Sequence, residues 1–373
     1  MKIIQIGKYP PNSFGGIEKL VNRLNYDLNK NNIQNDIACF NLTRSNKIEI
    51  SNNTHIYKCG TIFKIFSIPF SISLFTLLAK KIKRYDLVHL HLPNPIAAFY
   101  VLLLKKDIKK LTIHFHADYS NHPGYLFYGP IEKKVFEFSN KIIVTTNSLS
   151  NCKALRKFKK KIKVIPLFLS KKEYQIKNPN YNSLSKYKNM KFIIFVGRFV
   201  KYKNIDILIK AYSKFSKFCN LVLVGNGEEI KNIHRFIEKL KLKNSIFIEK
   251  NLDDEGKKYL LQKALFSVLP STTSAESYGY VQVESMALGT PVVSFKIKNS
   301  GVSEVNKHKK TGLVIKVGIS NYQNIKLLSK SFDKLIKNKS ILKKYSNNAL
   351  KESLKYQSKN LIKDYISIFN KDI

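Results

Sequence analysis

Two glutamates, Glu276 and Glu284, stand where a ligand rich in hydroxyl groups would bind. The apolar run 264–269 predicts a buried strand, a Ser/Thr loop and Gly279 follow it, and a helical run then ends at residues 289–291. We therefore expect Glu276 in a loop beyond a strand's carboxyl end and Glu284 about one turn into the next helix, where open α/β sheets bind ligands. A carboxylate accepts hydrogen bonds from neighbouring hydroxyls, and glycine lets backbone N–H groups approach closely.

A second loop carries cations that suit a diphosphate. Residues 197–204 read Gly-Arg-Phe-Val-Lys-Tyr-Lys-Asn; they follow a predicted strand, 191–197, and precede a predicted helix, 205–218. Arginine binds phosphate through two parallel hydrogen bonds, and lysine acts as a point charge. Only six of the 66 basic residues are arginine, so an arginine after a strand-end glycine is more informative than another lysine. We expect Arg198 and Lys203 to neutralise a diphosphate.

Glycines also follow two other predicted strands. Gly15 and Gly16 open a helix predicted over 16–30, whose free N–H groups and positive dipole end attract an anion. The spacing is not Gly-x-Gly-x-x-Gly, so a nicotinamide-type site is disfavoured. Gly225-Asn226-Gly227 lacks a third glycine, which favours a contact with a nucleotide base or a structural turn.

Strands and helices alternate through most of the chain, which predicts parallel sheets with helices on both faces. We divide the chain into a first Rossmann-like domain over 1–170, a linker over 171–190, a second Rossmann-like domain over 191–350, and a C-terminal helix over 351–373 that packs back on the first domain. The strands are predicted at 2–7, 35–41, 86–90, 111–116, 141–145 and 163–166, and then at 191–197, 220–224, 245–248, 264–269, 291–294 and 312–315. Further helices of the first domain are predicted at 74–83, 95–105 and 128–139.

The chain is strongly basic. Its 373 residues are 44% hydrophobic and carry a formal net charge of +41, which attracts nucleic acid or an anionic lipid surface. The lysines are spread throughout, and no aromatic-basic RNA motif or helix-turn-helix string is present. A nucleic-acid-binding protein is therefore an alternative that only the net charge supports. Lys153–Lys163 is either a membrane-facing patch or a solvated helix end, and the lysine excess can also be compositional.

Other features point to the cytoplasm. The four cysteines form no Cys-x-x-Cys, which is typical of reduced thiols, and the N-terminus does not read as a signal peptide. The run 65–79 contains Pro69 and four polar residues, so we expect a packed helix, with a membrane-dipping helix as the alternative.

These motifs together resemble the retaining, GT-B-fold glycosyltransferases of group 1 (family 4). The likeness is carried by the string Pro270–Pro291, the Gly-Arg-Phe-Val-x-x-Lys loop and the Gly-Gly-x-Glu loop. It implies that Glu276 lies near the transferred sugar, that Glu284 binds the ribose, and that Arg198 and Lys203 hold the diphosphate. Other donor-binding residues implied are Gly15, Gly16, Gly225, Tyr278, Gly279 and Tyr280.

The resemblance also gives roles to residues at the ends of the strands predicted over 86–90 and 111–116. His116 matches the histidine that contacts the donor sugar or phosphate, and it joins Glu276, Arg198 and Lys203 in the candidate catalytic set. Asp118, His89 and His91 are candidates for the acceptor side. Asn299-Ser300 departs from the family's Gly-Gly, and the Ser-Gly-Val-Ser form that follows hints at mannosyl or rhamnosyl transfer.

The implied function is transfer of a hexose from a nucleotide-sugar to a lipid-linked or polysaccharide hydroxyl during surface-glycan assembly at the cytoplasmic membrane face. No cofactor and no metal are expected, because the chain has no Asp-x-Asp and Arg198 and Lys203 can replace a divalent ion. A sugar-nucleotide 2-epimerase of similar architecture, which needs no acceptor, is the alternative enzyme.

Overall fold

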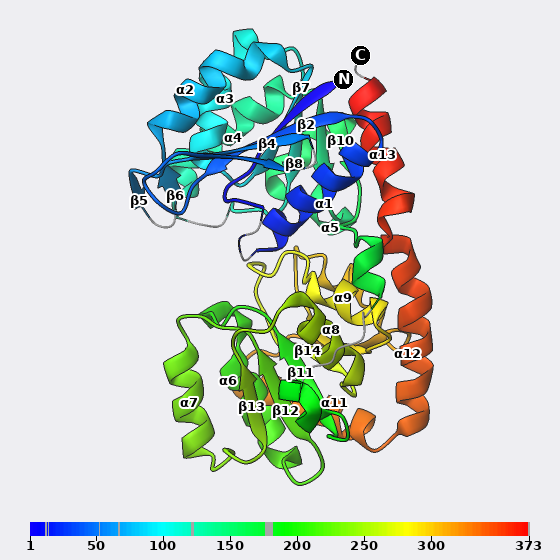
Figure 1. Ribbon diagram of the computed structural model, residues 1–373. Helices are drawn as coiled ribbons and strands as arrows, with labels where there is room; N and C mark the ends of the chain where they lie inside the picture. Colours follow the sequence, from blue (N-terminus) through cyan, green and yellow to red (C-terminus); the bar gives the residue numbers. More distant parts are fainter. Residues whose placement is uncertain are drawn as a thin grey trace. The chain divides into compact units, whose positions relative to one another are not determined.

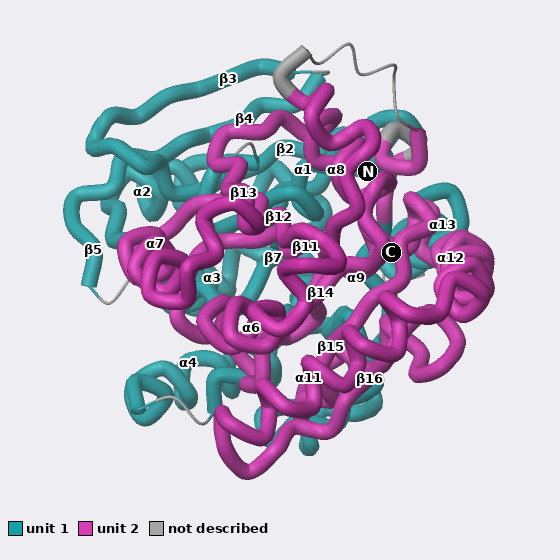
Figure 2. Tube along the Cα trace, turned by 90° about the horizontal axis from the view of Figure 1, so that it is seen from below, with its two compact units in different colours: residues 1–168, 358–373 teal, residues 169–357 magenta. Residues whose placement is uncertain are grey.

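The computed structural model describes every residue except 12, 14, 52, 66–67, 121–122, 176–181 and 372–373. The chain forms two compact units (Figure 2). Unit 1 comprises Met1–Phe168 and Ser358–Ile373, and unit 2 comprises Leu169–Gln357. Within the described ranges, no helix combines the length and apolar content that crossing a membrane requires.

Unit 1 is an eight-stranded sheet with helices on both faces (Figure 1). Its elements are β1 (Lys2–Ile6), α1 (Gly16–Lys30), β2 (Gln34–Phe40), β3 (Lys47–Ser51), β4 (Thr54–Cys59), β5 (Phe63–Ile65), β6 (Ile68–Phe70), α2 (Ile72–Lys81), β7 (Leu87–Leu92), α3 (Pro95–Leu103), β8 (Leu111–Phe115), α4 (Tyr125–Phe138), β9 (Lys141–Val144), α5 (Asn147–Ser150), β10 (Ile162–Val164) and α13 (Ser358–Lys371). In the eight-stranded sheet the strand order is β10-β9-β8-β7-β1-β2-β4-β3, and its strands pair in parallel except for β3 with β4. β5 and β6 form a separate antiparallel pair.

The two faces of the unit 1 sheet differ in chemistry. Because side chains alternate along a strand, Val88 and Leu90 of β7 pack with α2, α3 and α4 in an apolar core. His89 and His91, from the same strand, point to the opposite face, where His89 contacts Phe369 of α13. The face beneath α1 and α13 is therefore buried but partly polar.

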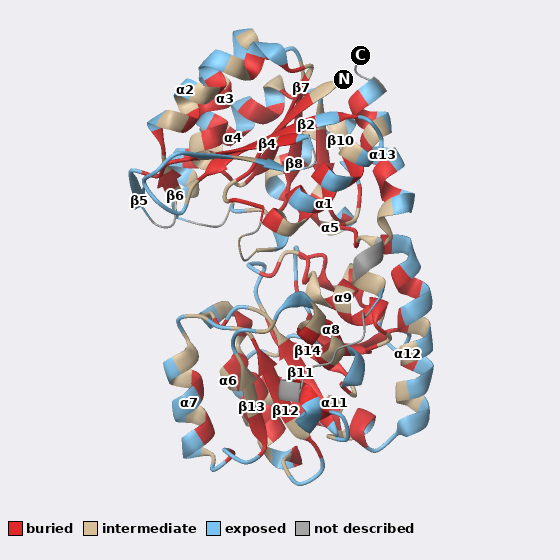
Figure 3. Cartoon of the chain, in the orientation of Figure 1, coloured by how far each residue is buried: buried red, intermediate tan, exposed pale blue. Residues whose placement is uncertain are grey.

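Unit 2 contains a six-stranded, wholly parallel sheet of order β13-β12-β11-β14-β15-β16. Its elements are β11 (Phe192–Val196), α6 (Ile205–Tyr212), β12 (Asn220–Val224), α7 (Ile230–Lys239), β13 (Ile246–Glu249), α8 (Asp254–Lys263), β14 (Ser267–Leu269), α9 (Val281–Ala287), β15 (Val292–Lys296), α10 (Val302–Val305), β16 (Gly312–Lys316), α11 (Asn321–Ile336) and α12 (Lys339–Ser353). Large apolar cores cover both sheet faces, and the four inner strands are mostly buried (Figure 3).

The alternating α/β prediction is confirmed, and α1 has the bounds that the sequence predicts. The sequence did not predict β3 and β4. β3 is short and mostly exposed at the edge of the sheet, and His55 and Lys58 interrupt the apolar run of β4. The predicted linker 171–190 falls within unit 2, where Leu184 and Tyr187 are buried and the Tyr187 hydroxyl donates to Glu249; residues 176–181 lie outside the described residues. Of the predicted C-terminal segment 351–373, residues from Ser358 onward belong to unit 1.

Candidate functional site

The loops after β11 and β14 are the centre of the candidate site in unit 2. These two strands are neighbours in the sheet, with Ile194 opposite Ser267, and the chain runs from β11 outward to β12 and β13 before returning to β14. This is the topological switch point, where open α/β sheets form a ligand crevice beyond the carboxyl ends of their strands. Arg198 and Lys203 follow β11, and Glu276 follows β14.

Lys203 and Glu276 form a buried ion pair at this switch point. The Lys203 ammonium donates to Oε2 of Glu276, and the Ser271 hydroxyl donates to the same oxygen over 3.0 Å. Relative exposure is 9% for Lys203 and 7% for Glu276, so neither side chain is merely part of a solvated surface. Buried charges need such partners, and the pair brings the predicted diphosphate loop into contact with the predicted sugar-binding acid.

Close contacts between backbone segments hold the predicted diphosphate loop, residues 197–204, in place. A Cβ atom on Gly225 would lie 2.0 Å from the Gly197 carbonyl oxygen, so only glycine fits there. The Phe199 amide donates to the Asn226 carbonyl over 2.8 Å, and Asn204, with a left-handed φ of 50°, donates to Thr272 Oγ1 over 2.8 Å. Gly225 thus supports the loop through its backbone, while Arg198 remains exposed on it.

The loop around Glu276 is fixed by the segment that departs from the family pattern. The Ser300 hydroxyl donates to the Glu276 carbonyl, and the Gly301 amide donates to the Ser277 carbonyl over 2.8 Å. Asn299 has a left-handed φ of 56°, a conformation that asparagine tolerates better than most residues. Ser300, which stands where the family has glycine, therefore links the segment 299–301 to the backbone of Glu276.

The segment between the two acids contains one conformation that requires glycine. Gly279 has a φ of 68°, and a Cβ there would lie 2.6 Å from a methyl group of Leu269. Tyr278 is buried, with an exposure of 4%, and Tyr280 is half-buried. Glu284 lies on α9, where its Oε1 accepts from the Lys257 ammonium over 2.8 Å. Lys257, on α8, was not predicted as a site residue.

In unit 1, the glycine pair lies at the start of α1 and Asp118 lies in a loop. Gly15 caps α1, and a Cβ there would overlap the Glu18 carboxylate, which occupies the space beside it. Gly16 is the first residue of α1 and is exposed. Asp118 is half-buried and accepts the Ser120 amide over 2.9 Å. Asn12 and Phe14 of the same glycine-containing loop lie outside the described residues.

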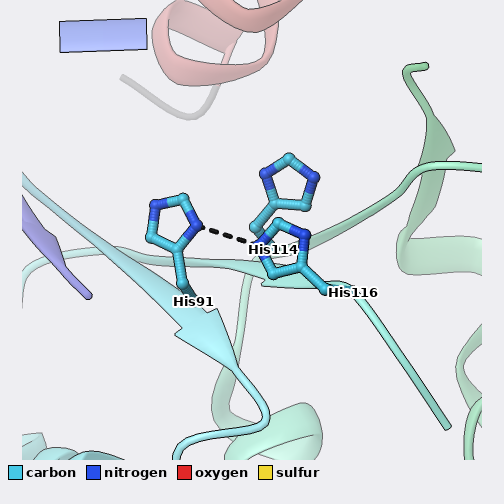
Figure 4. A group of neighbouring side chains, drawn as sticks. All are labelled: His91, His114 and His116. Atoms are coloured by element: carbon cyan, nitrogen blue, oxygen red, sulfur yellow. Dashed lines mark hydrogen bonds between the residues drawn. The ribbon is translucent and has the colours of Figure 1, made fainter. Parts of the chain in front are cut away.

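Four histidines gather on the α13-facing side of the unit 1 sheet. His89 and His91 come from β7, and His114 lies opposite His91 on β8. His91 Nδ1 lies 3.0 Å from His116 Nε2, and His91 Nε2 lies 3.0 Å from Gln5 Oε1 (Figure 4 shows the first of these bonds). His89 and His114 have no hydrogen-bond partner for either ring nitrogen in the described part of the chain.

Burial keeps these rings neutral. Desolvation lowers the pKa of His91 to about 3, and it lowers the pKa of His89, His114 and His116 well below the usual 6.5, with smaller contributions from neighbouring imidazoles. Relative exposure is 0% for His89 and 5% for His116. His89 therefore lies in the interior against Phe369, which does not suit the predicted role in contacting an acceptor.

Family models for glycosyl transferases of group 1 and for Glycosyltransferase Family 4 match residues 177–352 and 14–170, respectively. The chain belongs to the group 1, family 4 glycosyltransferases. This glycosyltransferase is 25% identical over 319 residues to the O-antigen chain mannosyltransferase C of Escherichia coli, a match that covers 84% of each chain.

Solved structures show the fold of the glycosyltransferase. Sucrose-phosphate synthase from Thermosynechococcus elongatus matches with a TM-score of 0.80 and 16% identity over 100% of this chain and 99% of that one. The Anabaena HepE complex with UDP matches with a TM-score of 0.76 and 17% identity over 100% of both chains. The glycosyltransferase therefore has the GT-B fold that the sequence resemblance implied, and neither comparison favours an epimerase or a nucleic-acid-binding protein.

Some residues that contact the candidate site residues had no sequence signal. Lys257, Ser271 and Gln5 are common residue types outside the recognised motifs, and their relevance follows from which strands and helices are neighbours. Asp253, the first residue of the pair Asp253-Asp254, caps α8 by accepting the Gly256 amide over 2.7 Å.

Proposed function

We propose that this glycosyltransferase transfers a hexose from a nucleoside-diphosphate sugar to a hydroxyl of a lipid-linked or polysaccharide acceptor, with retention at the anomeric carbon. The observation that carries the proposal is the buried Lys203–Glu276 pair at the switch point of unit 2. It puts a cation suited to a diphosphate beside a carboxylate suited to sugar hydroxyls. That combination matches the two halves of a nucleotide-sugar.

In the proposed reaction, the bond between the anomeric carbon and the diphosphate oxygen breaks while the acceptor hydroxyl attacks from the same face. The acceptor's proton passes to an oxygen of the departing diphosphate, which leaves as the nucleoside diphosphate. Arg198 and Lys203 stabilise the negative charge that develops on this leaving group. Glu276 orients the sugar through its hydroxyls, and Lys203 and Ser271 hold the carboxylate in place.

We assign the ribose to Glu284. Its carboxylate is already held by Lys257 over 2.8 Å, so the side chain is oriented before a ligand arrives. Two vicinal ribose hydroxyls can donate to one carboxylate. Tyr278, Gly279 and Tyr280 lie between the two acids and belong to the same donor-binding segment, together with the loop that Gly225 supports.

One observation favours surface-glycan assembly as the setting, and a second favours a class of donor sugar. The Escherichia coli relative is named as an O-antigen chain mannosyltransferase, and the Ser-Gly-Val-Ser sequence at 300–303 hints at the same mannosyl or rhamnosyl class. We therefore place mannose-type and rhamnose-type nucleotide-sugars first among the donors. In unit 1, we assign His116 to a contact with sugar and keep Asp118 as the acceptor-side candidate. His91 does not suit the predicted acceptor-side role, because it is buried and both of its ring nitrogens are hydrogen-bonded, one to Gln5 and one to His116.

The test is release of nucleoside diphosphate from a panel of UDP-, GDP- and dTDP-sugars, with and without a glycan or prenyl-diphosphate-linked acceptor. We expect one donor to release its nucleoside diphosphate only when acceptor is present. Conversion of the nucleotide-sugar without any acceptor would instead indicate the 2-epimerase. No turnover or binding of any nucleotide-sugar would reject the proposal.

We also propose that the enzyme works at the inner membrane surface, drawn there by its positive charge. Not every lysine of the segment 153–163 is available to contact a membrane. The Lys161 ammonium donates to the Phe136, Glu137 and Ser139 carbonyls and so caps α4. Lys157, Lys159 and Lys160 are exposed on the same segment.

Replacing Lys157, Lys159 and Lys160 with serine should weaken binding to anionic vesicles by up to about 3 kcal/mol, at about 1 kcal/mol per lysine near the bilayer. Three exposed lysines of unit 2, Lys239, Lys241 and Lys243, replaced in the same way, form the control. Equal vesicle binding by both variants would show that the charge acts diffusely rather than through this segment.

A further inference from the structure

A chain of hydrogen bonds runs from Gln5 through His91 to His116 in the buried polar face of unit 1. We infer that Gln5 and His91 are positioning residues that fix the tautomer of His116, so that His116 offers a bare Nδ1 to a substrate hydroxyl. The inference rests on the proposed function for the identity of that substrate. The tautomer itself follows from the contacts of this chain.

We refer to the hydrogen-bonded side chains of Gln5, His91 and His116 as the relay. The orientation of the Gln5 amide sets the direction of its hydrogen bonds. Its Nε2 donates to the Val21 carbonyl over 3.5 Å, and its Oε1 lies 3.0 Å from His91 Nε2. A flipped amide would set its oxygen against the Val21 carbonyl oxygen. Since a carbonyl oxygen only accepts, the proton of His91 must be on Nε2. His91 Nδ1 therefore carries a lone pair.

His116 must complete the next bond as the donor. His91 Nδ1 lies 3.0 Å from His116 Nε2, and a neutral imidazole with its proton on Nε2 has none on Nδ1. The two ring planes are within 5° of parallel and their centroids are 5.3 Å apart, farther than the 4.1 Å between His114 and His116, so the two rings meet through the nitrogens at their edges. His116 thus uses its only N–H on His91, and its Nδ1 is left as an acceptor.

A metal site is the competing interpretation of this cluster. His91, His114 and His116 have nitrogens within 4.8 Å of one another. A shared ion would need three lone pairs that converge, and each lone pair lies in the plane of its ring. Here His114 stacks over His116 at a centroid distance of 4.1 Å and an angle of 20°, and the His91–His116 nitrogens oppose each other (Figure 4). The geometry is that of a hydrogen-bonded, stacked cluster.

The surroundings keep the relay neutral and rigid. His89 and His114 contact Phe369 and Tyr365 of α13, respectively, and Gln5 has an exposure of 0%. Burial lowers the pKa of each histidine in the cluster, so no imidazolium forms to reverse the donors. A neutral acceptor at Nδ1 suits a group that donates a hydrogen bond. That chemistry selects a sugar hydroxyl and disfavours a phosphate oxygen, which only accepts.

The test is ¹⁵N NMR of the histidine side chains in the full-length protein, because the chemical shift of each ring nitrogen reports whether it carries a proton. We expect His116 protonated at Nε2 and bare at Nδ1 in the wild type. Gln5→Met removes the acceptor at nearly constant volume and should convert His116 to a mixture of tautomers. Thr112→Val changes another buried polar residue of β8 outside the relay and should leave the tautomer unchanged.

The same variants are then assayed for transfer and for nucleoside-diphosphate binding. Gln5→Met should lower kcat about tenfold, the effect of one net hydrogen bond, with unchanged affinity for the nucleoside diphosphate. Wild-type His116 protonated at Nδ1, or a tautomer unaffected by both Gln5→Met and His91→Phe, would overturn the inference. The NMR measurements of the tautomer do not depend on transfer activity. A wild type that binds no nucleotide-sugar would therefore reject the proposed function and leave the NMR result standing.

Discussion

The two units build their candidate sites from opposite kinds of polar group. In unit 2 the groups are charged and paired, as in Lys203 with Glu276 and Lys257 with Glu284. In unit 1 they are neutral, as in the bonded series Gln5, His91 and His116 beneath α13. Charged pairs can bind an anionic diphosphate and orient ribose, whereas a neutral relay can only offer directed hydrogen bonds. The difference predicts that unit 2 binds an anionic ligand and that unit 1 binds a neutral group that donates hydrogen bonds.

The comparison also explains how each site tolerates burial. A buried ion pair is stable only while both partners remain, because an uncompensated charge is costly. A buried imidazole is stable only while it stays unprotonated, because desolvation disfavours its charged form. Unit 2 should therefore be sensitive to loss of a charge, and unit 1 to gain of one.

The largest expected effect tests the charged site. Arg198→Ala should lower turnover about 10²–10³-fold, because the leaving diphosphate loses a donor that acts on its developing charge. Arg235→Ala, an exposed arginine on α7 in the same unit, is the control and should keep the wild-type rate. Steady-state kinetics at saturating donor measures both. A near-wild-type rate for Arg198→Ala would remove the arginine from the mechanism.

The second prediction tests the neutral site through acid. Unfolded histidines titrate near pH 6.5, whereas burial lowers the pKa of His89 well below that value in the folded protein. The unfolded state then binds more protons, so stability falls as pH drops below about 7. For one histidine that stays neutral when folded, the loss between pH 7 and pH 5 is about 2 kcal/mol.

His89→Phe isolates this contribution. Denaturant unfolding at pH 7 and pH 5 should show a loss of stability that is smaller in the variant than in the wild type by about 2 kcal/mol. The test compares the two proteins because Glu132 is present in both. Burial raises the pKa of Glu132 to about 7, so its contribution to stability increases as the pH falls, opposite to that of the histidine. Identical pH dependence in the two proteins would contradict the neutral-cluster account.

Sequence reasoning located the charged site better than the neutral one, for a physical reason. Arg198, Lys203, Glu276 and Glu284 lie in or next to strand-end loops that a local pattern predicts. That Lys203 meets Glu276 depends on β11 lying beside β14, which no local pattern states. The relay needs three neighbouring strands, since Gln5 lies 86 residues from His91 along the chain and meets it only through the β1–β7 pairing.

The third prediction separates binding from chemistry in unit 2. Glu284→Ala should raise the KM for the nucleotide-sugar about tenfold with little change in kcat, because ribose contacts are the same in the ground and transition states. Glu238→Ala, which removes an exposed carboxylate from α7, should leave both constants unchanged. Equal nucleoside-diphosphate affinity in wild type and Glu284→Ala would show that Glu284 does not hold the ribose.

The smallest expected effect is none at all. If Arg198 and Lys203 neutralise the leaving diphosphate, chelation by EDTA should leave the rate unchanged. The assay is run before and after exhaustive dialysis against chelator. Complete loss of activity that only Mn²⁺ or Mg²⁺ restores would mean that the charged pairs of unit 2 are insufficient for the leaving group.

Proton NMR of the transferred sugar, recorded as product first forms, tests the central claim most directly. The account predicts an anomeric configuration identical to that of the donor sugar, with one nucleoside diphosphate released for each glycosidic bond formed. An inverted configuration would contradict same-face transfer. A sugar altered on its nucleotide without any new glycosidic bond would contradict glycosyl transfer itself.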